Sequence, residues 1–466
     1  MEQFIISAAN FIWGTPLLIV LLGGGIFFTI YSRLLPLRYF RHAIDVLRGK
    51  YDEDNEKGEI SHFQALSGHL AATVGMGNIS GVAVAIVTGG PGAIFWMWVS
   101  AIFGMTTKFF TCTLAIMFRG KDSNDQVQGG PMYVITEGMG SKWKPLAVFF
   151  CIAGLFAATP IFQTNQLVQI VQDILLVPND WLLPDKFKVT LSEGTIIDAT
   201  FMTRLSLGLV ITAFTAAVIF GGIRRIGEVA SRLVPFMMIL YVGTTLYILL
   251  SNFSELLPGL ALIFKDAFSA NSVLGGAVGA IIITGARRAA FSNEAGIGTA
   301  PLMHGAAKTS EPVREGLVAM LGPFVDTIVI CTMTGLAILI SGVWKETDLN
   351  GVSLTVKAFE SAIPTLGPYI LVICVFVFAF TTIFGASYYG KKCAVFLFGS
   401  KYGEYFNYWY VLIIVVGSVS SLAVAVGLID FMYALMAFPT MLSGVYLAPK
   451  VMKEAKRYFF TLQNNT

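Results

Sequence analysis

The residues best suited to binding small ligands lie between positions 62 and 88, in the stretch HFQALSGHLAATVGMGNISGVAVAIVT. This stretch is long enough to cross a bilayer, but Gly75, Gly77 and Asn78 lie near its middle, where a plain membrane anchor carries Leu and Ile. The pattern predicts a helix that unwinds there. Irregular backbone is tolerated at membrane depth only where it lines a cavity. We therefore expect a solute and an ion to bind around Thr73 to Asn78.

A second Gly-interrupted segment spans residues 272 to 307 and contains GGAVGAIIITGARRAAFSNEAGIG. Its break is predicted near Thr284, Gly285 and Ala286. Five spanning segments separate its start from that of residues 62 to 88, which is the arrangement expected of two five-helix inverted repeats. Opposed half-helix ends present N–H dipoles to an anion and C=O dipoles to a cation. An amino-acid carboxylate and a Na⁺ ion suit this pair.

Polar side chains at membrane depth need a reason, because they are costly there. Thr381 and Thr382 are adjacent hydroxyls that either bind an ion or bond back to their own helix. Asp326, in the middle of an apolar segment, is either an ion ligand or the partner of an arginine. The amide of Gln163, in IFQTNQ, either faces the pocket or bonds to a neighbouring helix.

Several charged residues also fall inside apolar segments. Arg287 or Arg288 with Glu294 would close the inner side of a cavity, unless these residues simply snorkel to the interface, as we expect of Lys108. The histidines and cysteines show no metal-ligand or disulfide spacing, so they are interpreted as packing residues: His42, His62, His69, His304, Cys112, Cys151, Cys331, Cys374 and Cys393.

Composition places these segments in a membrane. The chain has 466 residues, of which 55% are hydrophobic and 13% charged, with mean hydropathy +0.73. This excludes an ordinary soluble domain and predicts an all-α polytopic membrane protein. Apolar segments of about 20 residues recur eleven times: 11–32, 62–88, 93–118, 145–176, 203–222, 228–251, 272–307, 312–341, 366–398, 407–428 and 430–449.

The distribution of basic residues predicts the orientation. A run of Arg and Lys between Arg33 and Lys50 follows the first segment, which places the N-terminus outside and the C-terminus in the cytoplasm of a cell inner (plasma) membrane. The long loops 177–202, with Lys186 and Lys188, and 342–365 are then outside. The second contains SLTVKAFESAI, a short helix that is either a lid or a structural cap.

Five blocks in order resemble the alanine or glycine:cation symporter family: VGMGNISGVA (74–83), GGPGAIFWMWVSAIFG (89–104), GGPMY (129–133), FSNEAG (291–296) and VDTIVICT (325–332). The resemblance implies a LeuT-type 5+5 inverted repeat with one extra N-terminal helix, giving 11 transmembrane helices. It also implies Na⁺- or H⁺-coupled uptake of small neutral amino acids. The units implied are 1–61 (extra helix and cytoplasmic linker), 62–252 (first repeat), 253–452 (second repeat) and 453–466 (cytoplasmic tail).

The resemblance also assigns roles. The N–H groups of Met76 and Gly77 would receive the substrate carboxylate. The carbonyls of Ala71 and Val74 and the hydroxyls of Thr381 and Thr382 would hold Na⁺, with Asp326 near a second ion. The substrate-facing set is then Thr73, Gly75, Met76, Gly77, Asn78, Gln163, Thr284, Gly285, Ala286, Thr382 and Ala386.

Three departures from the family pattern bear on the substrate. Ala386 stands where members usually have Trp, which predicts a larger pocket and a substrate such as glutamine. The run QTNQ replaces QANS and adds an amide near the same pocket. The Glu that is frequent near Thr111 is absent.

Other classes of function fit the sequence less well. A membrane-embedded enzyme needs a nucleophile with a base or a metal cluster, and a channel needs a repeated polar ring; the sequence shows neither pattern. Among transporters, H⁺ coupling competes with Na⁺, because Asp326 and Glu294 can carry a proton and the threonine pair cannot. We expect no catalytic residues, no nucleic acid and no obligate protein partner.

Overall fold

The computed structural model describes residues 11–52, 56–123, 127–183, 189–190, 196–197, 199–268, 277–345 and 349–464. Lys186, Lys188 and the start of the predicted 272–307 segment lie outside these residues. The described part is helical apart from two short antiparallel hairpins, β1 (Gly120–Lys121) with β2 (Val127–Gln128) and β3 (Val189–Thr190) with β4 (Ile196–Ile197).

The helices follow one another with short connections. In the first half they are α2 (Thr15–Leu18), η1 (Ile19–Gly23), α3 (Gly24–Tyr31), α4 (Leu35–Arg38), α5 (Phe40–Leu47), α6 (His62–Thr73), η2 (Gly77–Gly81), α7 (Val82–Gly89), α8 (Ala93–Met117), α9 (Pro131–Tyr133), η3 (Val134–Met139), η4 (Ser141–Trp143), α10 (Lys144–Ala157), α11 (Ile161–Val171), η5 (Gln172–Leu176), α12 (Ala199–Ile219) and α13 (Gly222–Ser251). In the second half they are α14 (Phe253–Ala267), α16 (Ala277–Asn293), α17 (Thr299–His304), α18 (Pro312–Pro323), η7 (Phe324–Cys331), α19 (Thr332–Ser341), η8 (Val343–Lys345), α20 (Gly351–Ala362), α21 (Leu366–Phe398), α22 (Ser400–Gly403), α23 (Phe406–Val419) and α24 (Leu422–Asn464).

The long apolar helices match the predicted membrane segments. Within the described residues, 7 helices are long and apolar enough to cross a membrane, the bent pair His62–Thr73 and Gly77–Gly89 brings the number to 8, and Pro16–Tyr31 is a shorter apolar helix. On α12, large side chains such as Leu209, Val210 and Phe214 are exposed, as expected of a surface in contact with lipid. The chain is therefore an integral membrane protein, and the count of eleven spans stays a prediction.

The end of the chain differs from the prediction. The segments 407–428 and 430–449 do not meet near residue 429; the break falls at Ser420, whose backbone is extended, and α24 then continues unbroken to Asn464. Hydropathy misplaced the boundary because α24 remains helical beyond its apolar part. Tyr39 stacks on Phe459 with ring centroids 3.7 Å apart, which packs the final turns of α24 against the α4–α5 region.

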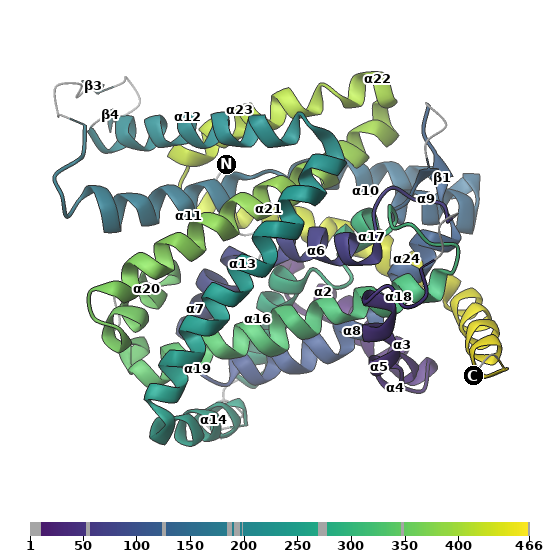
Figure 1. Ribbon diagram of the computed structural model, residues 1–466, viewed down its shortest axis with the longest axis horizontal. Coiled ribbons are helices and arrows are strands. Elements are labelled where there is room, and N and C mark those ends of the chain that lie inside the picture. Colours follow the sequence, from purple (N-terminus) through teal and green to yellow (C-terminus); the bar gives the residue numbers. More distant parts are fainter. Residues whose placement is uncertain are drawn as a thin grey trace.

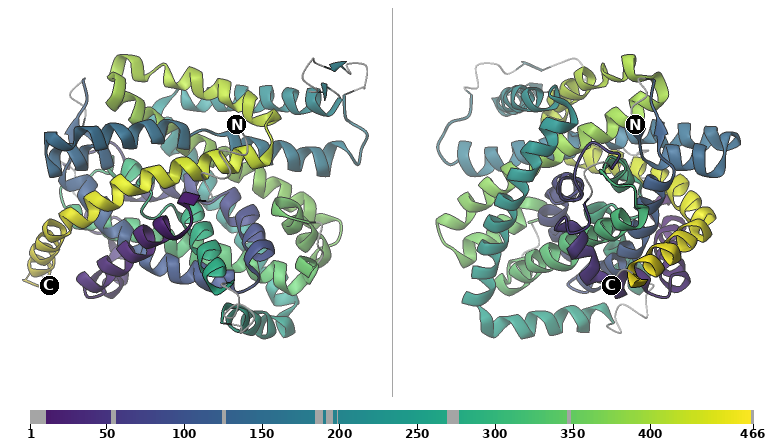
Figure 2. Two further views of the ribbon diagram at one scale, coloured as in Figure 1. Left: turned by 180° about the vertical axis from the view of Figure 1, so that it is seen from behind. Right: turned by 45° about the vertical axis from the view of Figure 1, so that its right-hand side comes forward.

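The broken helix lies in the middle of the molecule. Figure 1 shows α6 and α7 surrounded by α8, α13, α16 and α21, with α12 and α23 lying alongside each other at one edge. Figure 2 shows α24 crossing the opposite side of the molecule obliquely. α20 packs against η2, so the predicted short helix over residues 353–363 is confirmed as a helix.

An ion pair fixes α16 against α24. Arg287 donates from Nε to Asp430 Oδ2 at 3.0 Å, and its guanidinium lies 5.7 Å from the centre of the Trp13 ring. Trp13 Nε1 donates to the Asp430 backbone oxygen at 2.6 Å. Glu294 is not the partner, because it accepts from the Tyr433 hydroxyl at 2.7 Å. The predicted Arg–Glu pair is therefore wrong: Asp430, 143 residues from Arg287, takes the partner's place.

Removing the carboxylate of this pair should destabilise the protein. Asp430→Asn leaves the Arg287 guanidinium largely buried without an anion, and losing one partner of such a pair costs about 3 to 5 kcal/mol. We expect a clear fall in the melting temperature in detergent. Asp45→Asn, which breaks the exposed Lys50 to Asp45 pair at 3.5 Å, should leave it unchanged. Equal melting temperatures for Asp430→Asn and the parent protein would contradict a stabilising role.

Candidate functional site

The first predicted break is confirmed. α6 ends at Thr73, Val74 is extended with φ −72° and ψ 101°, and η2 begins at Gly77. The two halves are bent by 55°. Gly75 adjoins α21 so closely that a Cβ placed on it would lie 2.5 Å from Thr382 Oγ1. A glycine is therefore required here by close approach rather than by an unusual backbone angle.

Asn78 satisfies part of the backbone that the break exposes. Its Oδ1 accepts from the Gly75 N–H at 2.8 Å, and its Nδ2 donates to Asp326 Oδ1 at 2.8 Å. Because Gly75 donates to this side chain, the Ala71 carbonyl four residues earlier loses its helical donor. Among the described residues, no acceptor takes the N–H groups of Met76 and Gly77. The break thus offers free donors beside a free acceptor.

The second break does not lie where the sequence predicted it. α16 is continuous from Ala277 to Asn293, so Thr284, Gly285 and Ala286 are helical. A Cβ on Gly285 would lie 2.7 Å from the Ala93 carbonyl, which shows that this glycine permits close packing of α16 on α8. Thr284 packs against Gly89, at the end of α7 remote from the first break. The glycine pattern alone could not distinguish helix packing from helix breaking.

The actual second break runs from Glu294 to Gly298, inside the FSNEAG block. Glu294, Gly296 and Gly298 have φ values of +55°, +85° and +109°, a left-handed backbone that ends α16. Asn293 Oδ1 accepts from the Ala295 N–H at 3.0 Å, and its Nδ2 donates to Thr327 Oγ1 at 3.0 Å. Each break is therefore closed by an asparagine that also bonds to η7.

The two breaks adjoin each other around Asp326. A Cβ on Gly77 would lie 3.2 Å from Ser292 Cα, so η2 rests directly on the end of α16. Besides Asn78, the buried Asp326 carboxylate accepts from Ser292 Oγ and from Thr327 Oγ1, each at 2.7 Å. The alternative of an arginine partner for Asp326 is wrong, because amide and hydroxyl donors surround it instead.

The threonine pair divides its work. Thr381 Oγ1 donates to the carbonyls of Val377 and Phe378, each at 3.0 Å, which is the back-bonded alternative. Thr382 Oγ1 is buried, has no hydrogen-bond partner among the described residues and faces Gly75. Thr382 therefore holds an unused oxygen beside the free carbonyl of α6.

The remaining predicted residues lie around this core. Thr73 Oγ1 bonds back to the His69 carbonyl at 3.0 Å, and buried Oε1 of Gln163 has no donor within the described part of the chain. Ser80 of η2 donates to Gln166 Oε1 at 3.3 Å, so Gln166 carries the contact between α11 and η2. Ala386, half-buried, follows Thr382 by one helical turn and shares its side of α21.

Sequence reasoning missed a buried polar network at the other end of α6. Glu315 of α18 bonds through its two oxygens to Nδ1 of His62 and Nδ1 of His304. The spacing of these residues gave no signal, because His62 and Glu315 are 253 positions apart. These histidines therefore link α6, α17 and α18 through polar contacts, a role that the packing interpretation did not foresee.

Lys108 belongs to the same region. It is 1% exposed, and its Nζ contacts His69 Nε2, while His69 Nδ1 lies 3.0 Å from the Tyr389 hydroxyl. The prediction that Lys108 snorkels is wrong, because its position on α8 faces α6 and α18 instead of the membrane surface. A lysine in the middle of an apolar helix was the signal that could have identified this network.

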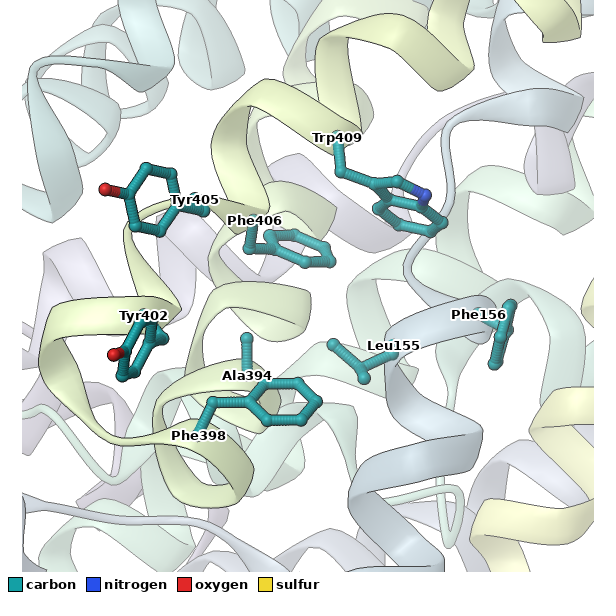
Figure 3. Close-up of a pocket in the computed structure, with 8 residues that line it drawn as sticks. All are labelled: Leu155, Phe156, Ala394, Phe398, Tyr402, Tyr405, Phe406 and Trp409. Carbon is teal, nitrogen blue, oxygen red and sulfur yellow. The ribbon is translucent and has the colours of Figure 1, made fainter.

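A separate hollow of about 340 Å³ lies away from the breaks. Figure 3 shows it lined mainly by aromatic rings of α10, α21 and α23, among them Phe156, Phe398, Phe406 and Trp409. None of the predicted site residues lines it. Its apolar walls offer no donor or acceptor set for a zwitterion, so it is not a second candidate for the substrate site.

Comparison with known proteins agrees with this geometry. The sodium/alanine symporter AgcS of Methanococcus maripaludis is 39% identical over 455 residues, covering 96% of this chain and 95% of AgcS. The probable sodium/glutamine symporter GlnT of Bacillus subtilis is 34% identical over 459 residues, covering 98% of this chain and 91% of GlnT.

A solved structure shares the fold. MhsT, a LeuT-type protein crystallised in complex with L-phenylalanine, matches with a TM-score of 0.54 and 15% identity, covering 85% of this chain and 98% of MhsT. The family model of the sodium:alanine symporter family matches residues 1–466. This chain, with its broken α6–α7 helix, belongs to the sodium:alanine symporter family.

Proposed function

We propose that this protein is a Na⁺-coupled symporter of neutral amino acids, residing in the cell inner membrane with its N-terminus outside and its C-terminus in the cytoplasm. Membership of a symporter family establishes amino-acid and cation co-transport in outline. The observation that carries the proposal is the first break, where two free N–H groups lie beside a free carbonyl and the unpartnered Thr382 hydroxyl. That combination suits a zwitterion and a hard cation.

The substrate carboxylate binds the N–H groups of Met76 and Gly77, at the start of η2. A helix N-terminus favours negative charge because its N–H dipoles point toward the ligand. Gly75 and Asn78 shape this part of the site, since Asn78 holds the Gly75 N–H and keeps it from competing with Met76 and Gly77. Gln163 and Ala386 form the side of the pocket that sets substrate size.

The cation binds between α6 and α21. The Ala71 and Val74 carbonyls with the Thr381 and Thr382 hydroxyls supply oxygen ligands, which Na⁺ prefers. Thr381 can accept through its lone pairs while its hydrogen stays bonded within α21. Asp326, behind Asn78, is the proposed ligand of a second ion.

Proton coupling is the second candidate. Oε2 of the buried Glu294 has no hydrogen-bond partner among the described residues, although its Oε1 accepts from Tyr433. A buried carboxylate oxygen without a donor is costly when ionised, so protonation relieves it. Asp326 is less suited, because donors reach both of its oxygens.

Transport follows alternating access. The cation joins α6 to α21 and favours the state open to the outside; the amino acid then fills the gap between the breaks, and the surrounding helices rock to open inward. The ion must bind one state more tightly than the other, because an ion that binds both equally shifts no population.

The close approach of Gly75 to Thr382 should be essential for uptake. Gly75→Ala forces the break away from α21, and overpacking of this kind costs about 1 to 3 kcal/mol, so we expect uptake into proteoliposomes to fall about tenfold or more. Gly81→Ala is the matched control, because nothing lies within 4 Å of a Cβ there. Similar uptake by the two variants would refute the proposed geometry.

The Thr382 hydroxyl should set the affinity for Na⁺. Thr382→Ala removes one ligand and, for a loss of about 1.4 kcal/mol, raises the Na⁺ concentration for half-maximal uptake about tenfold. Uptake is measured at symmetrical pH under an inward Na⁺ gradient, and again under a pH gradient without Na⁺. Thr88→Ala, which removes an exposed hydroxyl bonded to the Val84 carbonyl, serves as control. Uptake driven by the pH gradient alone would replace Na⁺ by H⁺.

Ala386 should set the size of the substrate. Ala386→Trp fills the side of the pocket one turn beyond Thr382, so we expect competition by glutamine to weaken and competition by alanine and glycine to persist. The measurement is inhibition of labelled alanine uptake by a panel of neutral amino acids. An unchanged order of competitors would show that Ala386 does not line the pocket.

A further inference from the structure

A hollow with three basic side chains lies at the end of the first apolar helix. It has a volume of about 650 Å³ and lies between the α3–α4 turn and the last part of α24. Arg33 and Arg38 line it from the turn and α4, and Lys456 lines it from α24. Figures 1 and 2 both show α3 and α4 close to the C-terminal part of α24. Two elements more than 400 residues apart thus bring positive charges to one place.

None of the three basic groups is neutralised within the described part of the chain. Arg33, Arg38 and Lys456 form no ion pair or side-chain hydrogen bond there, and no acidic residue lines the hollow. Nearby carboxylates have other partners: Asp45 pairs with Lys50 at 3.5 Å, and Glu454 pairs with Arg457 at 2.6 Å. Three like charges that converge without a counterion point to an anionic ligand.

The hollow lies at the depth of lipid headgroups. α3 ends the apolar helix Pro16–Tyr31 and exposes Ile26, Phe27 and Ile30, the last at 72%. These side chains face acyl chains in a membrane, and the hollow follows directly after Tyr31. Its wall also includes the apolar Leu35 and Met452. The surface therefore changes from apolar to basic over one turn, as a phospholipid does in the opposite sense of charge.

The backbone holds this arrangement in an unusual conformation. Arg33 and Leu34 have φ values of +54° and +60°, a left-handed conformation that is disfavoured for residues with a side chain. The Arg33 N–H donates to the Ile30 carbonyl and the Leu34 N–H to the Thr29 carbonyl, each at 3.0 Å. The sharp turn brings Arg33 to the hollow directly after the end of the apolar helix.

We infer that this hollow binds the phosphate headgroup of an anionic phospholipid, whose acyl chains lie along the exposed face of α3. Free phosphate shares the headgroup chemistry but leaves the apolar face of α3 and the Leu35 and Met452 wall unused. The site is distinct from the substrate site and does not depend on which ion drives transport. A bound lipid bridges α3 and α24, so it stabilises their contact.

The test is lipid binding by native mass spectrometry on the full chain in detergent, with phosphatidylglycerol compared with phosphatidylcholine. The variant is Arg33→Gln, Arg38→Gln and Lys456→Gln together. Each basic residue near an anionic lipid contributes about a factor of five, so we expect about a hundredfold weaker binding of phosphatidylglycerol. The matched control is Arg41→Gln, Arg48→Gln and Lys453→Gln, which removes the same charge from exposed positions outside the hollow and should retain the tight site.

The outcomes separate the possible ligands. Selective binding of phosphatidylglycerol that only the first variant loses, with a matching loss of the rise in melting temperature, supports the site. Equal loss in the control variant shows diffuse attraction and overturns it, as does an equal rise in melting temperature with inorganic phosphate alone. If the triple variant does not fold, Lys456→Gln alone is measured, and about fivefold weaker binding is expected; unchanged binding overturns the proposal.

Discussion

The candidate site depends on how the backbone groups exposed by two helix breaks find partners inside a membrane. Water cannot satisfy them there, so the protein must. Asn78 and Asn293 do this in the same way, since each accepts a backbone N–H next to its break and donates to η7. Asp326 and Thr327, which receive these bonds, are consecutive residues. One short segment of π-helix therefore fixes the position of both breaks relative to each other.

The π-helical form of η7 is part of this arrangement. A π turn has one extra residue per hydrogen-bonded ring, so it shifts the side chains that follow relative to an α-helix, and such turns occur often at functional sites. Here Asp326 turns toward Asn78 and Ser292 while Thr327 turns toward Asn293. The amino-acid site needs no charged side chain at its centre, because the carboxylate of Asp326 stands behind the amide of Asn78.

The sequence predicted the first break and not the second, for a physical reason. At Gly75 and Gly77 a polar Asn78 follows the glycines, and that side chain supplies the partners that the broken backbone needs. Gly285 has no such neighbour, and its missing side chain serves the contact with Ala93 instead. The real break at Glu294 to Gly298 has the same signature as the first, an asparagine beside glycines. Partners distant in sequence, such as Asp430 for Arg287 and Glu315 for His62, could not be predicted, since only the fold brings them together.

The two ends of the broken helix are held by different kinds of contact, and this asymmetry bears on how transport is coupled. On the η2 side, Thr355 of α20 donates to the Ile79 carbonyl at 3.2 Å, a single hydroxyl bond. On the α6 side, His62 and His69 belong to a buried network with Glu315, Lys108 and Tyr389. Breaking charged hydrogen bonds without water costs more than breaking one neutral bond. The α20 side therefore opens at lower cost, and movement of α6 requires energy that ion and substrate binding at Val74 to Gly77 must supply.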